Sequence, residues 1–257
     1  MTSTFLLGGL GNQMFQIAAA KSLAISTNDD FGLNYSLCHT PNQGKKGTFY
    51  KNSIYKNIKE IPNNEMSCVL YDEKSFHFSP IPKRKNTVIR GYFQSEKYFI
   101  DHKNEVLNEF YFSNSDVDYL NKKFNTLNQE CVSVQIRRGD YLKFSDFHPP
   151  CSTEYYEQAI KYFGRNKSFI FVSDDIKWVK DNFTGDNYLY FEEDNEILGL
   201  ILLTICNHNI ISNSSFGWWG AYLNKNSDKK IIAPSKWFGP KAKNNTKDLI
   251  PEKWKRI

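Results

Sequence analysis

Two adjacent arginines, Arg137 and Arg138, are followed at once by Gly139 and Asp140. Guanidinium groups grip phosphate in a planar, bidentate way, and a neighbouring carboxylate can orient an arginine or act on a substrate hydroxyl group. Apolar residues alternate with polar ones before this motif, which predicts a β-strand over 131–137. Because open α/β sheets bind ligands at the carboxyl ends of their strands, the motif favours a phosphate site. The alternative is a solvated surface turn, since short motifs also match by chance.

Two further strands predicted in the second half of the chain also end in polar residues. One is followed by Asp174 and Asp175, and the other by Asn213, Ser214 and Ser215. The carboxyl ends of parallel strands meet at one edge of a sheet, so these residues and the arginines are expected to line one crevice. A nucleotide diphosphate fits it, because the arginines offset its charge, the serines donate from a helix N-terminus and the aspartates accept from ribose or base. Helix capping is the alternative for either aspartate.

A glycine-rich turn lies near the amino terminus. Phe5–Leu7 predicts a buried strand, Gly9 and Gly11 belong to a tight turn, and Asn12 is expected to cap a helix over Gln13–Ile25. The dinucleotide fingerprint GxGxxG fails because a methionine stands at the third glycine position, so NAD binding is not predicted. Either the glycines only make a sharp turn, or Asn12 and the next glutamine present their amides to a polar ligand.

Strands and helices alternate regularly in the second half, which implies a parallel sheet with helices on both faces. The sequence pattern predicts strands at 31–37, 87–92, 131–137, 168–172, 188–191, 209–211 and 230–233. It predicts helices at 96–110, 153–163 (capped by Ser152 or Thr153), 175–182, 194–206 (capped by Asp194) and 216–223. Residues 38–86 lack a clear period, so they are expected to be loop-rich and to shape specificity for an acceptor. Trp218 and Trp219 have the spacing of core residues.

The composition excludes several classes of protein. A chain of 257 residues with a net charge of +5 is globular, long enough for one large or two small domains, and has no basic stripe or nucleic-acid-binding module. Five cysteines without a CxxC motif argue against a disulfide framework and a zinc site, and indicate a reducing compartment. The five histidines show no metal-ligand spacing, and the DxD at Asp116–Asp118 is interpreted as solvent-facing. The basic clusters Lys83–Lys85 and Lys229–Lys230 are interpreted as solvated faces.

No segment has the length of a membrane span. The apolar amino terminus is interrupted by glycines and has no basic residue before Lys21, so it is a poor signal peptide. The apolar run Ile197–Cys206 is well short of the ~20 residues that a membrane helix needs. A cytoplasmic protein is therefore expected.

Together these motifs resemble the α-1,2-fucosyltransferases of glycosyltransferase family 11. The resemblance runs over most of the chain, and its motifs occur in order and at suitable distances, which makes chance a poor explanation. They are GGLGNQMFQ at 8–16, GYFQSEKYF at 91–99, RRGDY at 137–141, FVSDD at 171–175, SNSSFGWWGAYL at 212–223 and DLIPEKW at 248–254.

This resemblance implies an α/β fold of the GT-B type, with two facing Rossmann-like domains and a cleft between them. Residues 1–125 would form the N-terminal domain on the acceptor side, and 126–240 the C-terminal domain that binds the nucleotide-sugar donor. Residues 241–257 would form a tail that packs back on the N-terminal domain.

The implied activity is the inverting transfer of L-fucose from GDP-β-L-fucose to a galactoside hydroxyl group, in α-1,2 linkage, without a catalytic metal or other cofactor. The implied partners are the donor and a galactose-containing acceptor glycan of a surface polysaccharide such as O-antigen. Because the chain shows neither the membrane anchor nor the stem of the vertebrate members, it is expected to act in the cytoplasm on a soluble or lipid-linked glycan. A lipid-linked acceptor would bring it to the inner face of the membrane.

The motifs also imply roles for individual residues. Arg138 would hold the diphosphate and stabilise it as it leaves, and Arg137 would share the task. Asp140 would position the acceptor hydroxyl group or take its proton, while Asn12 would approach the reaction centre from the first domain. The other residues implied in donor binding are Gly9, Gly11, Gln13, Gln135, Asp174, Asp175, Asn213, Ser214 and Ser215.

One departure from the family pattern concerns Gln135. The family usually has histidine two residues before the first arginine, near the guanine, and glutamine can form hydrogen bonds but cannot carry a charge. A GT-B transferase that uses another nucleotide sugar is therefore a second hypothesis. A third is a glycan- or nucleotide-binding protein without turnover, which product formation would exclude.

Overall fold

The computed structural model describes residues 1–38, 44–62, 68–125, 130–164 and 166–257. The chain divides into two compact units, of which unit 1 comprises 1–112 with 244–251, and unit 2 comprises 113–243 with 252–257. The start of the predicted second domain, at 126, lies outside the described residues. So do parts of the predicted loop-rich segment 38–86, namely 39–43 and 63–67. The residues predicted as a C-terminal tail are shared between the two units.

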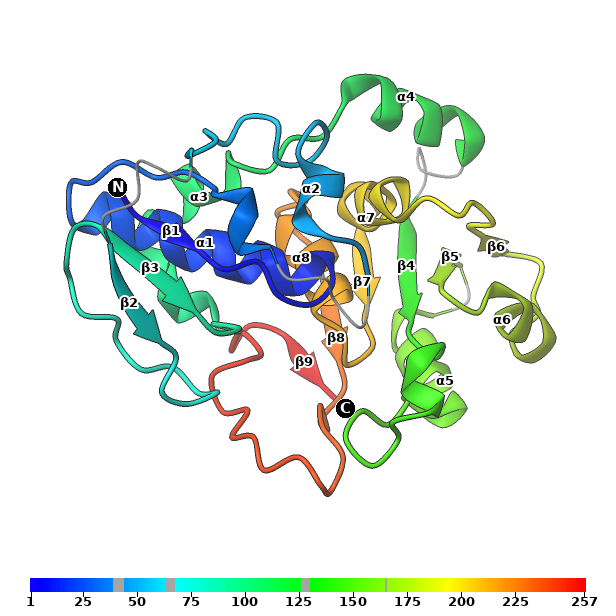
Figure 1. Cartoon of the computed structure of the whole chain (residues 1–257). Coiled ribbons are helices and arrows are strands. Elements are labelled where there is room, and N and C mark those ends of the chain that lie inside the picture. The colour runs from blue at the N-terminus through cyan, green and yellow to red at the C-terminus, as the bar shows by residue number, and fades with distance from the viewer. Residues whose placement is uncertain (39–43, 63–67, 126–129, 165) are drawn as a thin grey trace. The chain divides into compact units, whose positions relative to one another are not determined.

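Unit 1 contains a three-stranded parallel sheet in the order β1-β3-β2. These strands are β1 (Ser3–Thr4), β3 (Thr87–Arg90) and β2 (Val69–Asp72), with Ser3 beside Val88 and Val69 beside Thr87. The long helix α1 (Leu10–Ser26) is buried along most of its length and packs on this sheet (Figure 1). The shorter helices of this unit are α2 (Gly47–Tyr50) and α3 (Lys103–Leu107).

Three predictions for unit 1 differ from the structure. The first strand lies at Ser3–Thr4 rather than at the predicted Phe5–Leu7, where Leu6 forms only an isolated bridge with Cys38. The strand predicted at 31–37 is replaced by isolated bridges, followed by a 3-10 turn at Tyr35–Leu37. The side chain of Asn34 caps this turn. The helix predicted at 96–110 is broken at Phe99, whose φ of −143° and ψ of 6° lie outside the helical region.

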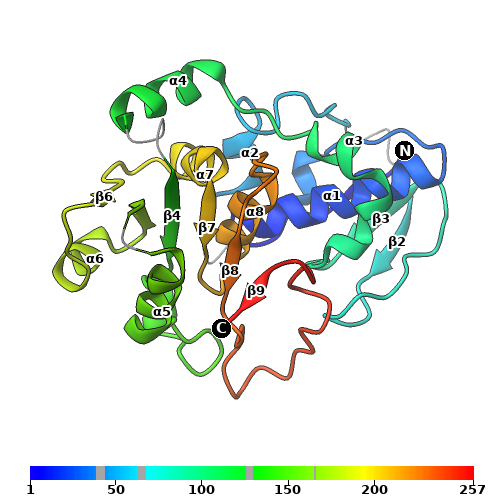
Figure 2. The same cartoon turned by 180° about the vertical axis from the view of Figure 1, so that it is seen from behind.

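Unit 2 contains a six-stranded, wholly parallel sheet in the order β6-β5-β4-β7-β8-β9 (Figures 1 and 2). Numbered within the unit, this is the order 3-2-1-4-5-6 of a Rossmann sheet, whose topological switch point falls between β4 and β7. The strands are β4 (Cys131–Ile136), β5 (Ser168–Ser173), β6 (Tyr188–Tyr190), β7 (His208–Ile210), β8 (Ile231–Ala233) and β9 (Lys255–Arg256). The helices are α4 (Asn114–Lys123), α5 (Thr153–Phe163), α6 (Ile176–Asn182), α7 (Glu196–Ile205) and α8 (Ser215–Leu223).

Most of the elements predicted for this unit are confirmed within a residue or two, whereas β9 was missed. Ser152 caps α5 and Asp175 caps α6 through their side chains. The cap of α7 is Asn195 rather than the predicted Asp194, since the Asn195 side chain accepts from the N–H groups of Ile197 and Leu198.

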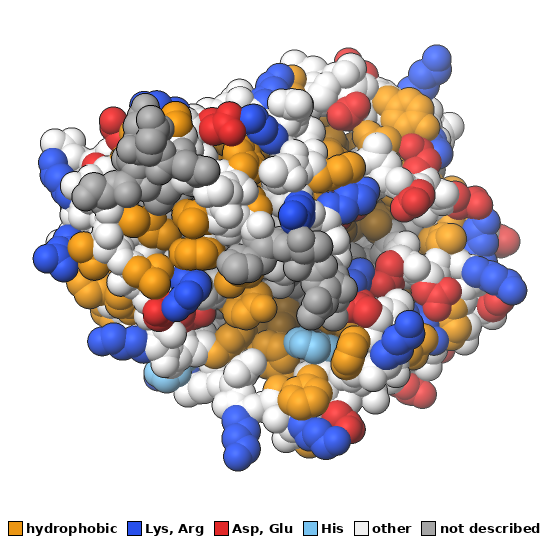
Figure 3. Space-filling view, in the orientation of Figure 1, with side chains coloured by type: hydrophobic (Ala, Val, Ile, Leu, Met, Phe, Trp, Pro, Cys, Tyr) orange, Lys and Arg blue, Asp and Glu red, His pale blue; other side chains and the backbone are white. Residues whose placement is uncertain are grey.

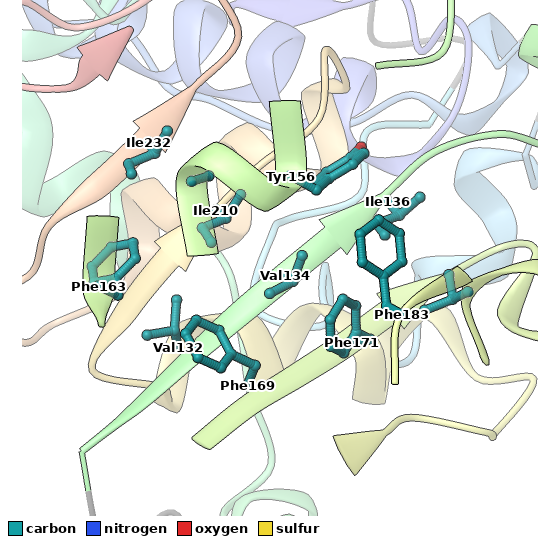
Figure 4. Packing of buried hydrophobic residues seen from close by; sticks show 12 residues of the cluster. Val132, Val134, Ile136, Tyr156, Phe163, Phe169, Phe171, Phe183, Ile210 and Ile232 are labelled. Atoms are coloured by element: carbon teal, nitrogen blue, oxygen red, sulfur yellow. The ribbon is translucent and has the colours of Figure 1, made fainter. Parts of the chain in front are cut away.

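The two faces of β4 are both buried but differ in chemistry. Val132, Val134 and Ile136 enter an apolar cluster with side chains of β5, β7, β8 and α5 (Figure 4). Ser133 and Gln135 point to the opposite face, where Asn209 donates to the Ser133 hydroxyl group at 2.7 Å. The alternation that predicted a strand thus separates an apolar face from a buried, hydrogen-bonded polar one.

Helix α8 is anchored by aromatic packing. Trp218 and Trp219 are completely buried, as predicted, and Trp218 stacks on Tyr222 with 4.5 Å between ring centroids and lies 5.4 Å from Trp254. At the other end of the helix, the Lys229 ammonium group donates to the carbonyl oxygens of Ala221 and Tyr222. Lys229 is therefore a helix-terminating cation rather than part of a solvated face.

Charged side chains are mixed on the surface. Figure 3 shows Lys and Arg interspersed with Asp and Glu over the face in view. Lys83–Lys85 is exposed, as the sequence predicted. This distribution agrees with the expectation that the small net charge is spread over solvated side chains.

Candidate active site

The predicted strand ends meet at the switch point of unit 2. Strand β4 lies between β5 and β7, so its carboxyl end, with Arg137 and Arg138, is flanked by the polar residues after β5 on one side and those after β7 on the other. Parallel pairing places Ile136 beside Ser173 and Val134 beside Ile210. The sheet order therefore brings three separate motifs of the sequence to the edge where doubly wound sheets bind ligands.

Asp174 holds both arginine residues. Its Oδ2 lies 3.0 Å from a terminal nitrogen of Arg137, and its Oδ1 accepts from the backbone N–H of Arg138 at 2.9 Å. A Cβ atom added to Gly139 would come within 2.6 Å of Asp174 Oδ2. Glycine at this position therefore lets the RRGD turn approach the carboxylate closely enough for both contacts.

Arg138 is held by two groups from the start of α6. Its Nε donates to Asp175 Oδ2 at 3.3 Å, and its guanidinium carbon lies 3.6 Å from the centre of the Trp178 ring. Stacking on an indole orients a guanidinium group through cation–π attraction. Because Asp175 contacts Nε, its hydrogen bond does not use the two terminal nitrogens of Arg138.

Asp140 faces Arg137 from the next turn of the chain. Its Oδ1 lies 2.6 Å from a terminal nitrogen of Arg137, although the pair is not aligned as a hydrogen bond. Both carboxylate oxygens are buried. Three carboxylates, those of Asp140, Asp174 and Asp175, thus surround two guanidinium groups, so the arginines are fixed in place while donors remain for a ligand.

Gln135 and Asn213 connect the strand ends through buried hydrogen bonds. Gln135 Oε1 accepts from the hydroxyl group of Ser212 at 2.6 Å and from its N–H at 3.2 Å. Asn213 Nδ2 donates to the carbonyl oxygens of Pro149 and Trp237, both at 2.9 Å, while its own carbonyl oxygen accepts from the Tyr141 hydroxyl group. Both side chains thus brace the loops around the switch point. Their predicted roles in donor binding stay predictions.

Helix α8 begins at this edge of the sheet. Ser214 is its N-terminal capping residue by backbone conformation but forms no side-chain capping hydrogen bond, and Ser215 is its first residue. The first N–H groups of a helix carry a partial positive charge and suit an anion. The predicted position of Ser214 and Ser215 at a helix N-terminus is confirmed, whereas phosphate binding there stays a prediction.

The predicted residues of unit 1 form a separate group around the start of α1. The helix begins at Leu10 with Gly9 as its capping residue, so the predicted cap Asn12 instead lies in the first turn together with Gly11. Asn12 Oδ1 accepts from Gln94 Nε2 at 2.7 Å. The Gln13 side-chain amide donates to the carbonyl oxygens of Gly8 and Lys45, which ties the glycine turn to a neighbouring loop.

Sequence reasoning missed two aromatic side chains of the site in unit 2. Trp178 stacks on Arg138, and His148 stacks on Tyr141 with 5.2 Å between ring centroids. An aromatic residue in the first helical turn after a polar strand end was an available signal for Trp178. The histidines had been considered only as metal ligands, and His148 has no metal-like spacing.

Metal ligands and disulfides are not apparent in the described part of the chain. No group of three or more His, Cys, Asp or Glu side chains there could hold a metal ion. The five cysteines are free thiols. The DxD motif lies on α4, where Asp118 is exposed and Asp116 half-buried.

Comparisons with solved structures and with a family model identify the fold and the family. The chain resembles the crystal structure of the fucosyltransferase NodZ from Bradyrhizobium, with a TM-score of 0.54 and 12% identity over 86% of this chain and 93% of that one. At this identity the likeness shows the fold, and it confirms the predicted α/β fold of the GT-B type. The model of glycosyl transferase family 11 matches residues 1–257, and the chain belongs to that family of enzymes.

Two curated relatives cover nearly the whole chain. The α-1,2-colitosyltransferase of Escherichia coli is 32% identical over 98% of this chain and 97% of its own length. The O-antigen biosynthesis glycosyltransferase WbnK of the same species is 29% identical over 97% and 98%. The prediction of a glycosyltransferase is therefore confirmed. Among the described residues, no helix is long and apolar enough to cross a bilayer.

Proposed function

We propose that this enzyme transfers L-fucose from GDP-β-L-fucose to a hydroxyl group of a galactoside, in α-1,2 linkage, with inversion and without a metal. The observation that supports this proposal is the pair Arg137 and Arg138 at the switch point of a sheet with Rossmann order. The diphosphate of GDP-fucose carries two negative charges and gains a third as GDP leaves, so preorganised cations that stabilise this charge lower the barrier without a proton transfer to the phosphate.

In this mechanism the acceptor oxygen attacks the anomeric carbon from the face opposite the diphosphate. The bond from the anomeric carbon to the phosphate oxygen breaks, and its electron pair leaves with GDP. The terminal nitrogens of Arg138 bind the diphosphate, Arg137 supports them, and the N–H groups at Ser214 and Ser215 add hydrogen bonds. Asp174 and Asp175 hold the arginines in the required orientation.

The acceptor is proposed to be a galactose-containing glycan of a bacterial surface polysaccharide. The name of the relative WbnK, an O-antigen biosynthesis enzyme, supports this class of acceptor. We also propose that the enzyme acts in the cytoplasm on a soluble or lipid-linked glycan. A lipid-linked acceptor would bring it into contact with the inner face of the membrane. The 38–86 segment is proposed to shape acceptor specificity.

A second candidate function is transfer of a different sugar from its GDP derivative. The relative named α-1,2-colitosyltransferase favours colitose, which is L-fucose without the 3-hydroxyl group. Gln135, which stands where the family usually has histidine, also supports this alternative. Its side-chain oxygen accepts hydrogen bonds from Ser212, so only its amide nitrogen could contact the donor. A site that binds the 3-hydroxyl group would discriminate strongly between the two sugars.

Calorimetric titration of the purified enzyme with GDP-fucose, GDP-colitose, GDP-mannose and UDP-galactose, in the presence of EDTA, tests the donor and the metal together. Tightest saturable binding of GDP-fucose is expected. Preference for GDP-colitose would support the second candidate, and preference for UDP-galactose would overturn both. Binding that appears only after a divalent cation replaces EDTA would contradict metal independence.

Asp140→Asn is expected to lower the rate of transfer about 10²-fold, because the carboxylate that positions the acceptor hydroxyl group or takes its proton is lost, while GDP binding stays within twofold of wild type. Asparagine keeps the shape of the side chain but cannot accept a proton at neutral pH. Steady-state transfer assays and GDP titrations would measure the two quantities separately. An unchanged transfer rate would exclude Asp140 from handling the acceptor.

A further inference from the structure

His148 is held rigidly beside the RRGD turn. Its ring stacks on Tyr141, with centroids 5.2 Å apart and 28° between the planes, and it lies 5.4 Å from the ring of Phe238. Its backbone N–H donates to the carbonyl oxygen of Phe144 at 2.8 Å. The next residue, Pro149, is tied to Asn213 through its carbonyl oxygen. Aromatic contacts and backbone hydrogen bonds on both sides thus fix where the imidazole lies.

His148 and Asp140 both carry buried polar atoms without a hydrogen-bond partner. Within the described part of the chain, Nδ1 of His148 is buried and has no hydrogen-bond partner, and the same is true of both carboxylate oxygens of Asp140. Buried polar atoms without a partner are rare and cost about 1–3 kcal/mol each, or more when charged. The charge of Asp140 is offset by Arg137, but that ion pair supplies no aligned hydrogen bond. A ligand that forms hydrogen bonds with these atoms would offset this free-energy cost.

His208 of the same unit shows what a structural histidine looks like here. Its ring also stacks on an aromatic residue, Phe163, with centroids 5.2 Å apart. Both of its nitrogens have partners, since Nε2 lies 2.8 Å from Glu130 Oε1 and Nδ1 accepts from the N–H of Lys230 at 3.1 Å. His148 shares the aromatic stacking but lacks a partner for Nδ1, so packing alone does not account for a histidine at 148.

His148 and Asp140 also interact electrostatically. Burial lowers the pKa of His148 below its ordinary value, and the charge of Asp140 partly opposes this effect. The imidazole is therefore neutral at pH 7 and can accept a proton, and the nearby carboxylate stabilises the cation that results. A carboxylate stabilises the imidazolium form of the general base in acyl-transfer enzymes as well, where it is also hydrogen-bonded to the ring.

We propose that His148 is a second catalytic residue, which binds the acceptor hydroxyl group together with Asp140 and takes up its proton during transfer. As the acceptor oxygen bonds to the anomeric carbon, its hydrogen passes to the imidazole as a proton, while the bonding pair to the diphosphate leaves with GDP. The imidazolium ion later releases the proton to water. This inference rests on the proposed function and assigns the proton acceptor within it.

Charge favours the acceptor rather than the donor as the ligand of this pair. The diphosphate is anionic, and the carboxylate of Asp140 repels it, whereas a neutral sugar hydroxyl group can donate to a carboxylate or an imidazole without repulsion. The acceptor hydroxyl group is also the one that must lose a proton. A hydroxyl donor is what the unsatisfied atoms of Asp140 and His148 require.

Two variants of His148 separate binding from proton transfer. His148→Asn keeps a hydrogen-bonding group near the position of Nδ1, so we expect a KM for methyl β-D-galactoside within threefold of wild type and a kcat reduced about 10²-fold. His148→Ala is expected to raise this KM and lower kcat together. The control is His208→Ala, which removes a stacked imidazole from the same unit and should lower Tm without lowering kcat per folded molecule.

Histidine ring resonances in NMR spectra give a readout that does not depend on turnover. We expect methyl β-D-galactoside, added to the GDP-saturated enzyme, to shift the His148 resonance and leave that of His208 in place; the variants assign both signals. A shift of His148 on addition of GDP alone, or transfer by His148→Ala within twofold of wild type, would overturn this inference. A wild-type enzyme that binds the galactoside at His148 but transfers none of the tested sugars would instead contradict the proposed function.

Discussion

Arg138→Ala is expected to lower the rate of transfer by about 10³-fold, at the upper end of the loss seen when one preorganised electrostatic donor is removed from an active site. The guanidinium group is held by Asp175 Oδ2 at 3.3 Å and by the Trp178 ring at 3.6 Å, so its position is set before the donor arrives. Alanine removes the charge and the hydrogen-bond donors together. The loss should appear mainly in kcat, because charge on the diphosphate grows as the sugar departs.

Arg138→Lys separates charge from geometry. Lysine keeps one positive charge but cannot stack as a plane on Trp178 or bind bidentately, so most of the loss should persist. Arg90→Ala is the matched control, since Arg90 also forms an ion pair with an aspartate, Asp72 at 2.5 Å, but lies exposed in unit 1. Single-turnover transfer, together with circular dichroism to verify folding, would measure these effects. Transfer by Arg138→Ala within tenfold of wild type would contradict its role in stabilising the leaving group.

Trp218→Ala is expected to lower the free energy of unfolding by about 3–5 kcal/mol, the range for aromatic-to-alanine changes in protein cores. The side chain is completely buried, and its ring contacts three other aromatic rings, those of Tyr222, Trp219 and Trp254. Alanine would leave a cavity under α8, the helix that begins at the proposed phosphate site. Donor affinity should therefore fall along with stability.

Urea unfolding followed by circular dichroism would measure this effect. The matched control is Tyr162→Ala, which removes an aromatic side chain from α5 that is 47% exposed, and it should cost less than about 1 kcal/mol. Because the chain has two units, the transition should be checked for a single cooperative step before the free energies are compared. A loss below about 1 kcal/mol for Trp218→Ala would show that α8 is held by other contacts.

The sequence by itself determined most elements of unit 2, other than α4 and β9, and the positions of its polar motifs. These signals involve residues that are close together in the chain. They include the alternation of apolar and polar residues over Val132–Ile136 and the helix-capping side chains of Ser152 and Asp175. Such signals survive folding because they depend on local backbone geometry and on which face is apolar. The family resemblance extended these local signals to the GT-B fold and to the glycosyltransferase class, both of which are confirmed.

Local signals were weaker in unit 1. The predicted strand over 31–37 is reduced to isolated bridges and a 3-10 turn. The helix expected over 96–110 is interrupted at Phe99. In the first segment, contacts with residues far along the chain, such as the bridge of Leu33 to Glu60, form in place of a continuous strand, and propensity over a short window cannot register them.

Only the tertiary structure decided how the site is assembled. The sheet order places β4 between β5 and β7, which brings Asp174 to Arg137 and Trp178 to Arg138 from distant positions in the sequence. It also turned Gln135 inward to Ser212, and it placed His148 beside the RRGD turn. Strand order depends on which buried faces pack together over the whole unit. The sequence therefore indicated the candidate residues of the site, while long-range packing determined which of them touch.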